Sequence, residues 1–119
     1  MIYPQEIEVW YVLPAIRREF AKSLVYQGLS QKEVSLKLGI TEAAISQYLK
    51  DKRASEIELE PFIKKAIERA AKKIIKQGNI MKEIERISYL MKKNKNLCEI
   101  HHKYDKDLPK HCDICLYEK

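Results

Sequence analysis

The sequence predicts an all-α fold built from five helices. Glycine occurs only 3 times in 119 residues, whereas lysine, glutamate and isoleucine are abundant, as is typical of helical proteins. Apolar residues recur at helical spacing in several segments, and proline, glycine or capping residues separate these segments. The predicted helices cover residues 14–27, 30–38, 41–50, 61–77 and 79–94.

The first predicted helix begins at Pro14, because proline lacks an amide hydrogen that would be unpaired in a first turn, and it ends at Gly28. Its spacing predicts that Ile16, Phe20, Leu24 and Val25 face inward and that Arg17, Arg18 and Lys22 face outward. Residues 1–13 form an apolar N-terminal arm, either a short helix after Pro4 or an extended segment. We expect Trp10 in this arm to anchor the core or an interface.

The second and third predicted helices form the most informative stretch, residues 30–50. Ser30 and Glu33 have the spacing of a capping box. Gly39 suits a left-handed helix end, and Thr41 is a good N-cap for the next helix. The predicted buried side consists of Val34, Leu38, Ile40, Ile45, Tyr48 and Leu49. The pattern predicts a helix-turn-helix, a motif that places its second helix in the DNA major groove; a plain helical hairpin is the alternative.

The opposite side of the motif supplies the predicted DNA contacts. Glu42 would accept a hydrogen bond from cytosine, Ala43 would touch a thymine methyl group, and Gln47 would pair with adenine. Ala44 is small enough to let the helix approach the groove closely. Other residues nearby are suited to contacts with phosphates. Together with these, the predicted DNA-binding residues are Gln31, Thr41, Glu42, Ala43, Ala44, Ser46, Gln47, Lys50, Lys52 and Arg53.

The net charge of +6 favours a polyanionic partner. The excess of positive charge lies mostly in residues 55–97, which carry 11 basic and 6 acidic side chains. These cations form either a solvated face or further contacts with phosphates. No apolar run long enough to span a membrane and no signal peptide is present, so we expect a cytoplasmic protein. An enzyme is not predicted, because the sequence offers no nucleophile with an adjacent base, no phosphate loop and no paired carboxylates.

The fourth and fifth predicted helices begin at Pro61 and after Asn79. Their apolar stripes consist of Phe62, Ile63, Ala66, Ile67, Ala70, Ile74 and Ile75, and of Ile80, Ile84, Ile87, Leu90 and Met91. These stripes would complete the core and leave surface for a second copy of the chain. We therefore expect a homodimer, because helix-turn-helix domains commonly bind twofold operators.

The end of the chain contains all three cysteines and all three histidines: Cys98, His101, His102, His111, Cys112 and Cys115. Cys98 and His101 form one chelating pair, and Cys112 and Cys115 form another. Two such pairs give the four tetrahedral ligands that zinc prefers. An iron–sulfur cluster is the alternative cofactor. The alternative to any metal site is that these are ordinary surface residues. The reserve ligands are His102 and His111.

The region from Leu29 to Arg53 resembles the helix-turn-helix of the phage-repressor class of regulators (lambda and Cro, or XRE-type). The matching residues are Gln31, Val34, Leu38, Gly39, Ile40, Ile45 and Tyr48, while Ser35 replaces the usual alanine. The run that starts at Val9 is also similar to small archaeal predicted regulators that pair this domain with a C-terminal cysteine segment. The resemblance implies a lambda-repressor-like fold and binding to double-stranded DNA.

Together these observations predict three parts: the arm at 1–13, a DNA-binding domain at 14–95 and a metal-binding tail at 96–119. The predicted function is that of a sequence-specific transcription regulator. A protein-interaction module or antitoxin-like component with little DNA affinity is the alternative.

Overall fold

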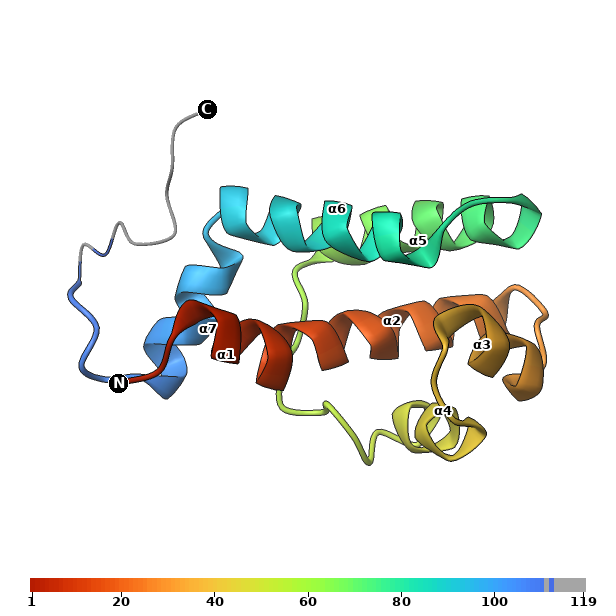
Figure 1. The fold of residues 1–119 in the computed structure, drawn as a ribbon, viewed down its shortest axis with the longest axis horizontal. Helices are drawn as coiled ribbons and strands as arrows, with labels where there is room; N and C mark the ends of the chain where they lie inside the picture. The colour runs from red at the N-terminus through yellow and green to blue at the C-terminus, as the bar shows by residue number, and fades with distance from the viewer. Residues whose placement is uncertain (111, 113–119) are drawn as a thin grey trace.

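The computed structural model describes residues 1–110 and 112, and all regular secondary structure in this part of the chain is helical. The elements are α1 (Pro4–Ile7), the π-helical segment η1 (Glu8–Val12), α2 (Leu13–Tyr26), α3 (Gln31–Leu38), α4 (Glu42–Leu49), α5 (Pro61–Lys76), α6 (Ile80–Lys93) and α7 (Asn96–Tyr104). Helix α2 lies at the centre, with α3 and α4 on one side and α5 and α6 on the other (Figure 1). The predicted all-α class is therefore confirmed. Among the described residues, no helix is both long enough and apolar enough to cross a bilayer.

The N-terminal arm is helical and continues into α2 without a break. The backbone stays right-handed through Val12 and Leu13, and η1 widens to π geometry just before Pro14. A proline ring clashes with the carbonyl group four residues earlier in an α-helix, and a π turn makes room for it. Pro14 therefore lies inside a longer helical run rather than at its start. Trp10 on η1 is 52% exposed, so of its two predicted roles the core anchor is wrong and the interface anchor stays a prediction.

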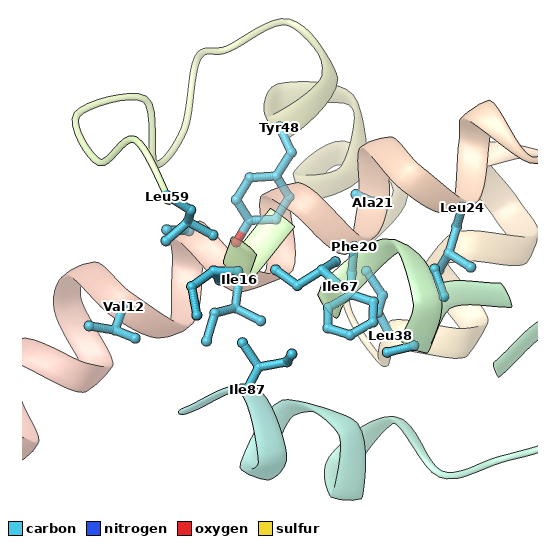
Figure 2. Close-up of a cluster of buried hydrophobic side chains, with 14 of the residues drawn as sticks. Val12, Ile16, Phe20, Ala21, Leu24, Leu38, Tyr48, Leu59, Ile67 and Ile87 are labelled. Atoms are coloured by element: carbon cyan, nitrogen blue, oxygen red, sulfur yellow. The ribbon is translucent and has the colours of Figure 1, made fainter. Parts of the chain in front are cut away.

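The core lies between α2 and the helices on both of its sides. Ile16, Phe20 and Leu24 of α2 are fully buried, as their spacing predicts. Figure 2 shows Tyr48 of α4 and Ile87 of α6 approaching this cluster from opposite sides. The α5 stripe is buried at Ile63, Ile67, Ala70 and Ile74. Ala66 and Ile75 of this stripe are half-buried, and Phe62 is 41% exposed.

Arg18 is buried, although its position on α2 predicted an outward side chain. Only 3% of the residue is exposed. Its Nε donates a hydrogen bond to the Glu19 carboxylate at 2.8 Å, and its Nη1 donates to the carbonyl oxygens of Ala54 and Ile57. These bonds offset part of the cost of removing a guanidinium from water. Arg18 is therefore not part of the solvated surface.

The region predicted as a tail begins with α7, which packs against α6 and the N-terminal helix. The Asp105 carboxylate accepts a hydrogen bond from the Ile2 amide at 2.8 Å, and His101 Nε2 lies 2.6 Å from the Ile2 carbonyl oxygen. The rings of Tyr11 and Tyr104 stack with centroids 3.9 Å apart and an interplanar angle of 5°. The start of the chain and α7 thus lie side by side (Figure 1).

Candidate nucleic-acid interface

Local capping interactions fix the geometry of α3 and α4. Ser30 Oγ accepts a hydrogen bond from the Glu33 amide at 3.1 Å, and the Glu33 carboxylate accepts one from the Ser30 amide at 3.0 Å. These bonds hold the pKa of Glu33 below its usual value. Gly39 ends α3 in the left-handed conformation with φ +68°, and Thr41 Oγ1 accepts from the Ala44 amide at 3.1 Å. The capping box, glycine turn and N-cap predicted from the sequence are all confirmed.

The inner side of the motif packs against α2 as the spacing predicts. Val34, Leu38, Ile45 and Tyr48 are buried. Ile40 at the corner is half-buried and packs against the same core. Because four anchoring side chains hold the two short helices, their outer side is presented in one orientation.

The outer side of α4 is open to solvent. Glu42 and Ala43 are exposed, and Ser46 and Gln47 are half-exposed. Within the part of the chain that the structure describes, the Glu42 and Gln47 side chains make no hydrogen bond. Ala44 differs from these residues, because it is 5% exposed and belongs to the core. Its predicted position on the groove-facing side is therefore wrong.

Two further predicted contacts stand at helix starts beside this surface. Gln31 is the first residue of α3 and is exposed. Thr41 is the exposed N-cap of α4, and its oxygen already accepts the capping hydrogen bond. Helix starts carry unpaired amide hydrogens and a partial positive charge, which suit a phosphate group.

A loop with three cations follows α4. Lys50, Lys52 and Arg53 are all exposed. The Arg53 guanidinium carbon lies 5.8 Å from the centroid of the Tyr48 ring, and the Lys52 amide donates to the carbonyl oxygen of Gln47 at 2.8 Å. The loop therefore leaves α4 through a tight turn, and its cations stand at the end of the helix.

The predicted metal ligands do not come together in the described part of the chain. Cys98 is half-buried and His101 is buried on α7, whereas Cys112 is half-buried beyond the helix. Cys115 lies outside the described residues. Within residues 1–110 and 112, no group of three or more histidine, cysteine or acidic side chains is placed to hold an ion. The four-ligand site therefore stays a prediction.

The reserve ligand His102 is engaged in other contacts. Its Nδ1 lies 2.7 Å from the Cys98 carbonyl oxygen, and its Nε2 lies 2.8 Å from the Pro109 carbonyl oxygen. The Pro109 contact, followed by the Cys98 contact, raises the pKa of His102 because both ring nitrogens are placed to donate. Both ring nitrogens of His102 thus face carbonyl oxygens of the chain. The other reserve ligand, His111, lies outside the described residues.

Residues 27–60 match the model of a helix-turn-helix family of the XRE type, the phage-repressor-like class. The match covers α3, α4 and the loop that carries the cations. This is a DNA-binding regulatory family that is generally non-enzymatic. No curated protein and no solved structure matches the chain. The predicted helix-turn-helix is thus confirmed at the level of the motif and its class.

Proposed function

We propose that this chain, which carries a phage-repressor-like helix-turn-helix, is a sequence-specific DNA-binding transcription regulator of the cytoplasm. The observation that carries the proposal is the open outer side of α4 with three exposed cations at its end. A buried or apolar surface here would favour a protein partner, whereas small polar side chains flanked by cations suit the edges of bases and the phosphates beside them.

In this proposal α4 lies in the major groove. Ala43 and Gln47 are one turn apart and share a side of the helix. Gln47 pairs with an adenine, Ala43 contacts a thymine methyl group, and Glu42 accepts from a cytosine amino group. The burial of Ala44 and Ile45 supports this assignment, because it fixes the rotation of α4 that leaves Ala43 exposed.

Phosphate contacts would hold the helix in register. The candidate groups are Gln31 at the start of α3, Ser46 within α4, and the cations Lys50, Lys52 and Arg53 directly after α4. Contacts of this kind supply most of the affinity without reading the sequence.

The test is selection of bound duplexes from genomic fragments, followed by affinity measurements on the selected and a scrambled duplex over a range of salt concentrations. We expect the selected duplex to bind more tightly and log Kobs to fall linearly with log salt. Binding no better than background to every duplex would instead support the protein-interaction or antitoxin-like alternative.

We propose further that the regulator binds as a homodimer. The support is the twofold symmetry of the operators that such motifs commonly bind, together with half-exposed apolar side chains on α5 and α6. These side chains are Ala66, Ile75, Ile80, Ile84 and Leu90. A dimer mass in light scattering at micromolar concentration, with or without DNA, is expected. A monomer mass under both conditions would reject this proposal.

A metal site formed by Cys98, His101, Cys112 and Cys115 is a separate proposal, supported by the spacing of the two chelating pairs. At His101 only one ring nitrogen is left for a metal ion. Its Nε2 contacts the Ile2 carbonyl oxygen, so the ion would have to bind Nδ1. Metal analysis and a visible spectrum of anaerobically purified protein test it. Zinc without visible absorption indicates a structural site, whereas visible absorption with sulfide indicates an iron–sulfur cluster. Protein without any metal would reject both.

A further inference from the structure

Two cations of α2 hold the loop that follows α4. Arg18 and Lys22 lie one turn apart on α2, and each bonds to a different part of residues 51–57. We infer that Arg18 and Lys22 are positioning residues for DNA binding, which hold this loop so that its three cations meet the phosphates. The inference rests on the proposed function.

Arg18 holds the distal half of the loop. Its Nη1 donates to the carbonyl oxygens of both Ala54 and Ile57, the latter at 2.6 Å. Because it is only 3% exposed, Arg18 has no access to a DNA molecule. Any effect of this residue on DNA binding must therefore pass through the loop.

Lys22 holds the proximal half of the loop. Its Nζ lies 2.6 Å from Asp51 Oδ1, and both side chains are partly exposed. This contact holds the pKa of Asp51 below its usual value. Asp51 is a carboxylate in a segment of cations, so on charge alone it opposes binding to DNA.

The loop backbone needs such support. Asp51 and Ala54 have φ values of +55° and +58°, in the left-handed region that residues with a Cβ rarely adopt. Lys52 and Arg53 lie between these two residues, and Lys50 lies directly before them. In the described part of the chain, none of the three cations forms an ion pair. Their direction is thus set by the backbone that Arg18 and Lys22 hold and, for Arg53, also by its contact with the Tyr48 ring.

Asp51→Asn separates positioning from simple charge. Removal of a negative charge near DNA would by itself tighten binding, whereas loss of the Lys22 contact would release the loop. We expect the affinity for the selected duplex to fall and the slope of log Kobs against log salt to flatten by about one unit. Asp51 is exposed, so the variant is expected to fold, which circular dichroism checks. Tighter binding with an unchanged slope would overturn the inference.

Arg18→Met tests the other anchor through coupling. In this variant the loop cations are no longer held, so Lys52→Ala should have less effect on the salt slope than it has in the unaltered chain. Arg17→Met is the matched control, because it removes the same charge from the neighbouring residue of α2; it should leave the effect of Lys52→Ala unchanged. Equal effects of Lys52→Ala in all backgrounds would overturn the inference.

If Arg18→Met fails to fold, Arg18→Lys replaces it, because the ammonium can still donate to backbone carbonyl oxygens. Arg18→Lys should bind with a salt slope no flatter than that of Asp51→Asn, and a slope flatter than that of Asp51→Asn would count against the inference. Absence of duplex binding by the unaltered chain would reject the proposed function and this inference together. Binding by the unaltered chain with no change in any variant would reject the inference alone.

Discussion

In the proposed function, sequence discrimination depends on Gln47. Its amide is half-exposed on the outer side of α4 and has one acceptor and two donor positions, which match the N6 and N7 atoms of adenine. We predict that Gln47→Ala weakens binding to the selected sequence by about 1–3 kcal/mol and relaxes the preference at one base pair.

A gel-shift series over single-base variants of the selected duplex measures this effect. Gln77→Ala, at an exposed glutamine after α5, is the control and should leave every affinity unchanged. If Gln47→Ala weakened binding to all sequences equally, Gln47 would not contact a base.

In the proposed function, Lys52 represents the contacts that do not read bases. It is exposed in the loop after α4 and forms no ion pair among the described residues. Lys52→Ala should weaken binding to all sequences alike and flatten the salt slope by about one unit. Lys106→Ala, in the segment after α7, provides the control. A slope unchanged by Lys52→Ala would place this lysine in solvent rather than on a phosphate.

At the scale of elements, the turn between α3 and α4 depends on Gly39. Its φ of +68° disfavours residues with a Cβ, although no heavy atom lies within 4 Å of the place where a Cβ would stand. The expected cost of Gly39→Ala is therefore conformational, about 1–2 kcal/mol in the free energy of unfolding.

Urea unfolding measures this cost. Gly39→Asn should lose less stability than Gly39→Ala, because asparagine tolerates the left-handed conformation better than alanine. Equal stability of the two variants would mean that the turn rearranges.

The contact between α7 and the start of the chain predicts a dependence on acid. The hydrogen bond from the Ile2 amide lowers the pKa of Asp105 below its ordinary value of 3.8, with smaller contributions from the Asp107 amide, the N-terminal amine and His101. A lowered pKa means that the contact stabilises the fold above pH 3.8 and that this stabilisation is lost as the pH falls through the folded-state pKa.

Asp105→Asn should therefore be less stable than the unaltered chain at neutral pH, and the difference should shrink in acid. Urea unfolding on both sides of pH 3.8 measures it. Asp107→Asn, at a side chain that is 87% exposed, serves as the control and should show little difference at either pH. A constant gap for Asp105→Asn would contradict the role of its charge.

The elements that the sequence predicts well are those with local signals. Ser30, Gly39 and Thr41 each act within a few residues of themselves, so α3 and α4 follow from the sequence. Helix α7 lacks such a signal: Lys95 precedes it with φ +63° and no side-chain cap. The burial of Arg18 depends on carbonyl groups 36 and 39 residues away, which spacing along α2 does not reveal.

At the scale of the whole molecule, the ends of the described chain meet in a way that the sequence did not predict. Part of the apolar arm is covered by α7, a helix that the sequence did not predict. His101 was predicted as a metal ligand from its spacing to Cys98. In the structure this buried histidine faces the carbonyl of Ile2, a partner 99 residues away in sequence. Spacing between potential ligands thus gives no information on such distant backbone partners.

The whole account depends on the outer side of α4 and the loop after it forming the surface that contacts DNA. The most direct measurement is an amide NMR titration of the unaltered chain with its selected duplex. We expect the largest shift changes at the start of α3, along α4 and through Lys50–Arg53, with small changes on α6 and α7. Specific binding whose changes lie on α5 and α6, with α4 and its loop unaffected, would contradict the account.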